Sequence, residues 1–144
     1  MTSEQLFSLC STLALAGWIC LVFLPRWRPS ATLVAPVLIP SLIAILYLWL
    51  VATSLPGAEG GFGTLAEVKL LFANERALLA GWIHYLAFDL FIGAWEVRDA
   101  RRRGIHHLAL VPCLLLTFLF GPVGLLLYLA MRAAWKKQVT VDAD

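Results

Sequence analysis

The chain has 144 residues, of which 61% are hydrophobic and only 14% are charged, and its formal net charge is +2. A mean hydropathy of +0.85 is typical of an integral membrane protein and excludes an ordinary soluble domain. The small net charge gives no indication of a nucleic-acid partner. We therefore expect a single membrane domain over residues 1–144, in which the three cysteines are small packing residues.

The first half of the chain predicts two membrane-spanning helices. Residues 5–25 and 29–58 carry no charged side chain, and each run reaches the roughly 20 residues that a helix needs to cross a bilayer. The start of the chain, MTSEQ, lacks the basic segment of a signal peptide, so we expect the first run to stay in the protein. The second helix is predicted over 31–54, with bends at Pro36 and Pro40.

The connection that follows predicts a short helix on the membrane surface. Its first part, PGAEGGFG, is typical of a flexible turn, and Thr64 and Glu67 have the spacing of a helix capping box. Apolar side chains then recur at helical spacing, which indicates an amphipathic helix near 64–73. Asn74 is the expected cap of the next helix.

The second half of the chain predicts two more spans. The third, over 76–97, is interrupted only by His84 and Asp89, and the fourth, over 107–132, is expected to bend at Pro112 and at the Gly121-Pro122 pair. Backbone polar groups must be satisfied within the lipid, so these segments are helices. The predicted fold is an all-α integral membrane four-helix bundle, with a short amphipathic surface helix between helices two and three.

Basic residues give a weak prediction of the orientation in the membrane. On one face, the first and third connections hold six of them: Arg26, Arg28, Arg98, Arg101, Arg102 and Arg103. The other face holds five: Lys69, Arg76, Arg132, Lys136 and Lys137. Because the short third connection is rich in arginine, we expect it in the cytoplasm and both termini outside.

The third helix carries polar side chains in the apolar segment GWIHYLAFDLF, residues 81–91. One stripe along this helix, spaced mainly by seven residues, consists of Glu75, Trp82, Tyr85, Asp89 and Glu96. A neighbouring stripe consists of His84, Phe88, Phe91 and Trp95. Simpler interpretations stay open: Glu75 and Glu96 as solvated interfacial charges, His84 as a contact between helices, and the aromatic residues as ordinary packing.

Asp89 is the residue that these interpretations do not explain. It lies near the middle of the predicted span, where an ionised carboxylate costs on the order of 3 kcal/mol. We therefore expect Asp89 to face the bundle interior as a neutral acid that can donate a proton. No CxxC, HxxxH or phosphate-binding glycine loop is present, so neither a metal nor a cofactor is predicted.

These residues resemble the neoxanthin synthase family, small plastid membrane proteins with bacterial relatives. The similarity extends over the chain and is sharpest over 62–132, where it is carried by Asn74-Glu75, Gly81-Trp82-Ile83-His84, Asp89-Leu90-Phe91, Asp99, His107 and Phe120-Gly121-Pro122-Val123-Gly124. The resemblance implies carotenoid chemistry, since the plant members are associated with converting violaxanthin into neoxanthin. In that isomerisation one epoxide opens and an allene forms, without redox change.

The amino terminus has none of the features of a plastid transit peptide, which indicates a bacterial inner-membrane protein. The resemblance therefore implies a carotenoid or other isoprenoid substrate more strongly than violaxanthin itself. For such an isomerase, Asp89 is the expected acid at the epoxide oxygen and His84 the expected base. The expected substrate-binding residues are Trp82, Tyr85, Phe88, Phe91, Trp95 and Glu75.

The proline bends predict a lipid-facing opening beside the stripe from Trp82 to Asp89. Further candidates for its wall are Tyr47, Trp49 and Tyr128. If glycines border this opening, Gly81→Leu and Gly93→Leu should block it with little loss of stability.

Two other classes of function stay open. The first is a non-catalytic carotenoid-binding or assembly subunit of a larger membrane complex, and the second is a proton-coupled carrier that uses Asp89. The small size and the lack of internal repeats disfavour the carrier. The expected partners are a carotenoid or other isoprenoid lipid and the membrane lipids, and either a homo-oligomer or a larger membrane complex is compatible with the chain.

Overall fold

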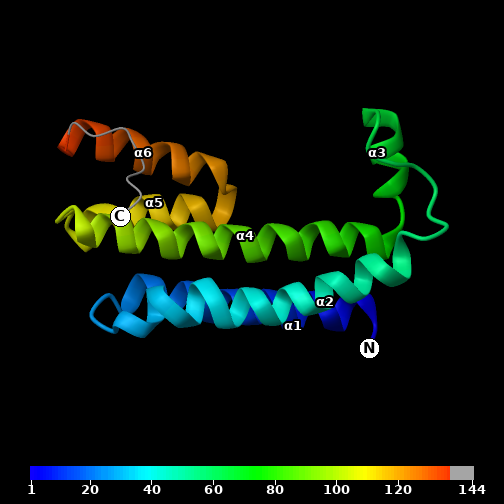
Figure 1. The fold of residues 1–144 in the computed structure, drawn as a ribbon, viewed down its shortest axis with the longest axis horizontal. Coiled ribbons are helices and arrows are strands. Elements are labelled where there is room, and N and C mark those ends of the chain that lie inside the picture. Colours follow the sequence, from blue (N-terminus) through cyan, green and yellow to red (C-terminus); the bar gives the residue numbers. More distant parts are fainter. Residues whose placement is uncertain (137–144) are drawn as a thin grey trace.

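The computed structural model describes residues 1–136, and the elements in this part of the chain are all helical (Figure 1). In chain order they are α1 (Ser3–Phe23), η1 (Ser30–Leu38), α2 (Ile39–Ser54), α3 (Leu65–Leu71), α4 (Glu75–Arg102), α5 (His107–Phe120) and α6 (Pro122–Lys136). Three helices within residues 1–136 are long and apolar enough to cross a membrane: α1, the continuous η1–α2 and α4. The predicted all-helical class is confirmed.

The predicted short helix between the second and third spans is present, together with its caps. Thr64 accepts a hydrogen bond from the Glu67 N–H at 3.2 Å and so caps α3, and Asn74 accepts one from the Arg76 N–H at 3.0 Å and caps α4. The helix α3 lies across the direction of α4 (Figure 1). Its Leu65 is 85% exposed, as expected of a side chain placed to meet lipid.

The second span has two helical forms. Pro36 has no N–H to donate, and the backbone around it widens into the π-helix η1, which tolerates the lost α-helical bond. Pro40 lies in the first turn of α2, where a missing N–H removes no bond within that helix. Both prolines are therefore accommodated by a change of helical form near the middle of this span.

Residues 107–132 form a hairpin of two helices, so the predicted fourth span was wrong. The helix α5 runs back along α4, the chain turns at Gly121, and α6 returns to the end where α5 began (Figure 1). Gly121 has φ of 44°, a left-handed conformation that ends α5, and Pro122 starts α6. With 14 and 15 residues, the two helices are each only about 21–23 Å long, against a hydrocarbon core of about 30 Å.

This hairpin also changes the predicted orientation. Residue 136 lies at the end of the molecule opposite the amino terminus, so the prediction that both termini share one side does not hold for the described residues (Figure 1). Arg132 lies on the side of the first and third connections instead of facing them across the membrane. Lys137, which was counted with it, lies outside the described residues.

The helix α4 is central, with α1 and η1–α2 packed on one side and the hairpin on the other (Figure 1). Small residues allow this close packing. A Cβ built on Gly93 would lie 2.5 Å from the Trp18 ring, and one built on Gly17 would lie 2.8 Å from Leu90. Gly93 is therefore a packing residue of the core and does not border an opening, so Gly93→Leu is expected to destabilise the protein, contrary to the sequence-based expectation.

Candidate functional site

Asp89 lies half-way along α4, under the turn of the hairpin. A Cβ built on Gly121 would lie 2.8 Å from Asp89 Oδ2, so the turn lies directly against the carboxyl group. This oxygen is buried and has no hydrogen-bond partner among the described residues. The carboxyl therefore faces the hairpin, and the residue as a whole is half-buried.

Tyr85 joins the tip of the hairpin to α4, one turn before Asp89. Its hydroxyl donates a hydrogen bond of 2.9 Å to the Phe118 carbonyl oxygen. Phe118 is in the last turn of α5, where carbonyl groups lack a partner within the helix. Tyr85 thus satisfies a helix end and fixes its position beside Asp89.

Two further acidic side chains of α4 lie under the hairpin. Glu96 is fully buried: its Oε1 accepts a 3.0 Å hydrogen bond from the Thr117 hydroxyl, and its Oε2 has no hydrogen-bond partner among the described residues. The interpretation of Glu96 as a solvated interfacial charge is therefore excluded, because α5 covers it. Glu75, by contrast, is exposed at the start of α4.

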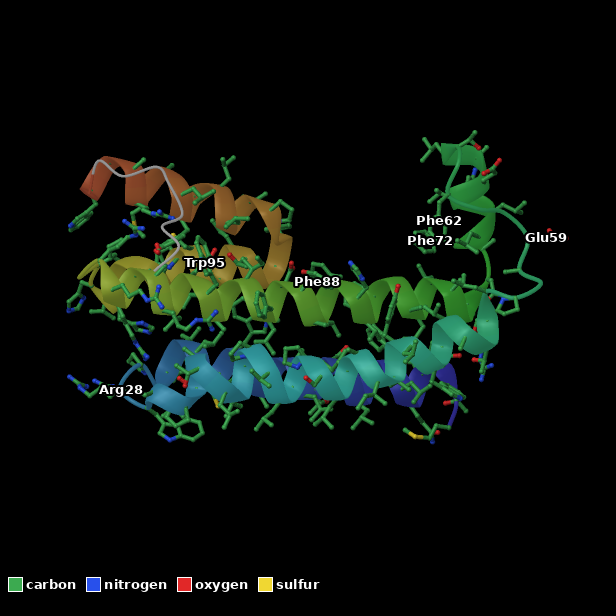
Figure 2. All side chains as sticks on the ribbon, in the orientation of Figure 1. Arg28, Glu59, Phe62, Phe72, Phe88 and Trp95 are labelled. Atoms are coloured by element: carbon green, nitrogen blue, oxygen red, sulfur yellow. The ribbon has the colours of Figure 1, made fainter. Side chains whose placement is uncertain are left out.

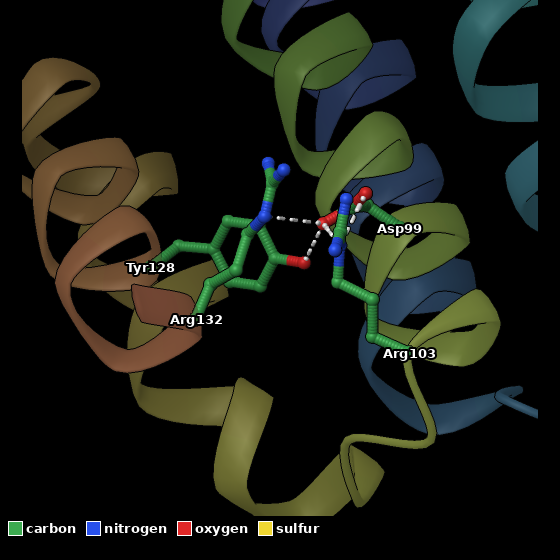
Figure 3. Close-up of polar contacts among 4 residues, drawn as sticks. All are labelled: Asp99, Arg103, Tyr128 and Arg132. Carbon is green, nitrogen blue, oxygen red and sulfur yellow. Dashed lines mark hydrogen bonds and ion pairs between the residues drawn. The ribbon is translucent and has the colours of Figure 1, made fainter. Parts of the chain in front are cut away.

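The second of these acids, Asp99, holds the base of the hairpin (Figure 3). Its Oδ2 accepts a 2.5 Å hydrogen bond from the Tyr128 hydroxyl and lies 3.5 Å from Arg132 Nε, and both partners are on α6. Arg103 Nε lies 3.0 Å from each carboxylate oxygen. Because Arg132 is only 1% exposed, the carboxylate compensates a cation that apolar surroundings would otherwise disfavour.

His84 lies on another face of α4 from Asp89, consistent with their five-residue separation along a helix. Its exposed ring stacks on Phe88 with 4.5 Å between ring centroids, and its centroid is 5.7 Å from that of Tyr47 on α2. The structure therefore does not bring the predicted acid and the predicted base together. Within residues 1–136, no three His, Cys, Asp or Glu side chains group as metal ligands.

The predicted aromatic stripe is divided between two environments. Phe88 and Phe91 are exposed and border a shallow cavity against Pro40 of α2. Trp95 instead lies between α4 and the hairpin (Figure 2). Its ring is edge-on to that of Tyr128, with the centroids 5.5 Å apart. A ligand beside Asp89 would therefore not contact the whole stripe.

An apolar groove of about 480 Å³ leads from the start of α4 toward Asp89. It is lined by the start of α1, by the residue that ends α3 and by the first turns of α4: Ser3, Glu4, Phe7, Phe72, Glu75, Leu78, Leu79, Gly81, Trp82 and Tyr85. Trp82 packs between the rings of Phe7 and Tyr85, with centroid distances of 5.5 and 5.4 Å. The groove ends at Tyr85, one helical turn short of Asp89.

Three predicted binding residues, Glu75, Trp82 and Tyr85, thus share this groove, and Gly81 borders it as expected. The three further candidates for the wall lie elsewhere. Tyr47 lines a smaller cavity of about 300 Å³ together with His84. The Arg76 guanidinium lies over Trp49, with its Cζ atom 5.2 Å from the centroid of the Trp49 ring. Tyr128 is on α6 and its side chain is fully buried.

Comparison with models of known protein families shows to which family the chain belongs. The sequence profile described as ABA DEFICIENT 4-like matches residues 5–128, a range that contains all but the first two residues of the three spans, together with Asp89 and the turn of the hairpin. The chain belongs to the ABA DEFICIENT 4-like family. Comparisons with curated proteins and with solved structures gave no match. The resemblance to neoxanthin synthase is confirmed, and the protein is a carotenoid-related membrane protein.

In this member of the ABA DEFICIENT 4-like family, sequence analysis gave no role to the buried cluster of Glu96, Thr117, Asp99 and Arg132. Asp99 and Glu96 were visible as acidic residues of α4. Their partners come from α5 and α6, between 21 and 33 residues later in the chain. One signal was available: Tyr128 and Arg132 are four residues apart and therefore share a face of α6.

Proposed function

We propose that the protein modifies an oxygen-bearing carotenoid, or a related isoprenoid, by acid–base chemistry at Asp89. The observation that carries this proposal is the placement of the carboxyl group, half-way along a spanning helix, with one buried oxygen that lacks a hydrogen-bond partner among the described residues. An intramembrane carboxyl group of this kind is costly to keep unless it has a function. The apolar groove that ends one turn away supplies a route for an apolar ligand.

The proposed reaction is an isomerisation that needs no redox partner. A neutral Asp89 donates its proton to an epoxide oxygen, the C–O bond breaks with its electron pair on oxygen, and a carbon of the polyene loses a proton. His84 lies on another face of α4, so in this proposal the Asp89 carboxylate formed in the first step takes that proton. The acid is regenerated, and the product has the same atoms as the substrate.

The groove supports a particular direction of entry. Measured along α4, it extends from Glu75 to Tyr85, about 15 Å, and its walls are mostly apolar or aromatic. A polyene fits such walls, and its oxygenated end ring would stop at Tyr85 and Asp89. The other end would point toward the start of α4, where Glu4 and Glu75 are able to accept a hydrogen bond from a ring hydroxyl.

One observation favours the alternative of pigment binding without catalysis. Asp89 is not among the residues that line the groove, and the turn of the hairpin packs against its carboxyl group. In that case the groove holds the pigment, while Asp89 is a structural residue of the hairpin contact.

Expression in a bacterial host that makes violaxanthin separates the two functions. Chromatography of the pigments should show a new isomer with the parent protein and none with Asp89→Asn, although pigment should still copurify with the variant. The matched control is Glu59→Gln, which also replaces a carboxyl by an amide group but in an exposed connection far from the site (Figure 2). An active Asp89→Asn variant would contradict the proposal, and pigment that copurifies unchanged with the parent would favour the binding function.

A further inference from the structure

A second cavity, of about 580 Å³, lies at the opposite end of α4 from the groove, where α4 turns into α5. Its lining combines basic and apolar side chains. The basic ones are Arg26, Arg101, His106 and His107, and the apolar ones include Val97, Ile105, Leu108 and Leu110. None of the described residues that line it is acidic.

The basic side chains of this cavity come from two separate turns. Arg101, on α4, donates a hydrogen bond to the Pro25 carbonyl oxygen in the α1–η1 connection, and His107 Nε2 lies 2.9 Å from the Val22 carbonyl oxygen. These contacts hold both side chains at the cavity wall and leave further N–H groups of the Arg101 guanidinium for a ligand. The exposed Arg26 side chain forms no hydrogen bond or ion pair with the described residues.

The positive charge here is not neutralised by a nearby carboxylate of the described chain. Asp99, the closest acid in the sequence, contacts Tyr128, Arg103 and Arg132 beneath the hairpin (Figure 3). Nitrogen-bearing side chains gather at the end of the molecule that carries Arg28 (Figure 2). Cations in such proximity repel one another, so an anion bound between them is stabilised.

We propose that this cavity binds the headgroup of an anionic phospholipid, with the phosphate between Arg26 and Arg101 and an acyl chain along Leu108. The cavity lies where α1 and α4 end, which is the level of lipid headgroups for helices that cross the bilayer. Leu108 is 73% exposed beside it and so offers an apolar surface continuous with the charged part. A lipid satisfies both parts of the site, whereas a free phosphate ion satisfies only the charged part.

A bound headgroup would connect the α1–η1 turn to the α4–α5 corner, because Arg26 belongs to the first and Arg101 to the second. Binding to the folded state alone raises the apparent stability with ligand concentration. The lipid is therefore expected to raise the midpoint of thermal unfolding in a saturable way.

The test uses the full chain purified in a neutral detergent. Dioleoyl phosphatidylglycerol should raise the unfolding midpoint and be retained in native mass spectrometry, whereas dioleoyl phosphatidylcholine and inorganic phosphate should do neither. Arg26→Gln removes no hydrogen bond or ion pair with the described residues and should fold normally, yet bind the anionic lipid about tenfold more weakly. Lys69→Gln, the same loss of charge on the exposed surface of α3, is the matched control and should bind as the parent does.

Equal stabilisation by the two phospholipids would overturn the proposal, as would an Arg26→Gln variant that binds phosphatidylglycerol as tightly as the parent. Stabilisation by inorganic phosphate equal to that by phosphatidylglycerol would assign the cavity to the free anion and overturn the assignment to lipid. None of these three results depends on whether Asp89 is catalytic.

Discussion

Gly121 is the residue at which the turn of the hairpin meets the Asp89 carboxyl group, and two separate constraints act on it. Its φ of 44° and ψ of −94° form a sparsely populated backbone conformation, which residues other than glycine adopt at a cost of about 1–3 kcal/mol. In addition, an added Cβ would lie only 2.8 and 2.9 Å from the two carboxylate oxygens of Asp89. Such contacts require either the hairpin or the carboxyl group to move.

Gly121→Ala is therefore expected to lower the free energy of unfolding by more than the backbone conformation alone costs, which is about 1–3 kcal/mol. In an Asp89→Ala background the loss should fall toward that value, since the carboxyl group is gone. Gly104→Ala is the control: its φ is 64°, and nothing lies within 4 Å of an added Cβ. Unfolding in mixed micelles is measured for the parent, both single variants, the double variant and the Gly104→Ala control. An equal loss from Gly121→Ala in both backgrounds would show that the turn does not press on Asp89.

At the scale of residues, the sequence indicates which side chains belong to the candidate site better than it indicates which side chains they contact. Asp89 was found because a carboxylate in an apolar helix is conspicuous, and Tyr85 because it lies one turn away on the same helix. Neither the contact of Asp89 with Gly121 nor the hydrogen bond between Thr117 and Glu96 follows from periodicity, because both depend on the chain turning back at residue 121.

At the scale of elements, the hairpin is the feature that the sequence did not predict. Residues 108–131 are uncharged and long enough for one span, so hydropathy alone favours a single helix. Two glycines favour the turn: Gly121 adopts the left-handed conformation, and a Cβ built on Gly124 would lie 2.0 Å from the Thr117 backbone nitrogen. Only a glycine at position 124 allows α6 to start so close to α5. The polar side chains of the hairpin that pair with Glu96 and Asp99 then face α4.

Asp99→Asn is expected to loosen the hairpin without unfolding the three spans. The variant keeps a hydrogen-bonding group for Tyr128 but removes the Asp99 charge that lies beside the buried Arg132, and the loss of one charge of a buried ion pair costs about 3 kcal/mol. Hydrogen exchange should increase in the amides of α5 and α6, while those of α1 and α2 stay protected. Glu59→Gln serves as the control, and uniform exchange in all helices would indicate that Asp99 stabilises the whole bundle instead.

For the whole molecule, the turn of the hairpin redistributes the charge. Among residues 1–135, seven arginines lie at the end where α4 meets α5: Arg26, Arg28, Arg98, Arg101, Arg102, Arg103 and Arg132. The opposite end has two, Lys69 and Arg76, and also carries Glu4, Glu59, Glu67 and Glu75. With four spans, the basic residues would be nearly balanced between the two ends of the molecule. Because the predicted fourth span is a hairpin, they are strongly concentrated at one end.

This asymmetry predicts the orientation, since basic residues in short connections are retained in the cytoplasm. We expect the α1–η1 turn, the α4–α5 corner and the end of α6 on the cytoplasmic side, with the amino terminus and α3 outside. A green fluorescent protein fused to the carboxyl end should therefore fluoresce in a bacterial host, because it folds in the cytoplasm. With the native cysteines replaced by alanine, Glu59→Cys should react with a membrane-impermeant maleimide on intact cells, and Trp27→Cys only after permeabilisation. A dark fusion together with external labelling at residue 59 would place the end of α6 outside and restore a fourth crossing of the membrane, and the hairpin turn would then no longer lie against Asp89 within the bilayer.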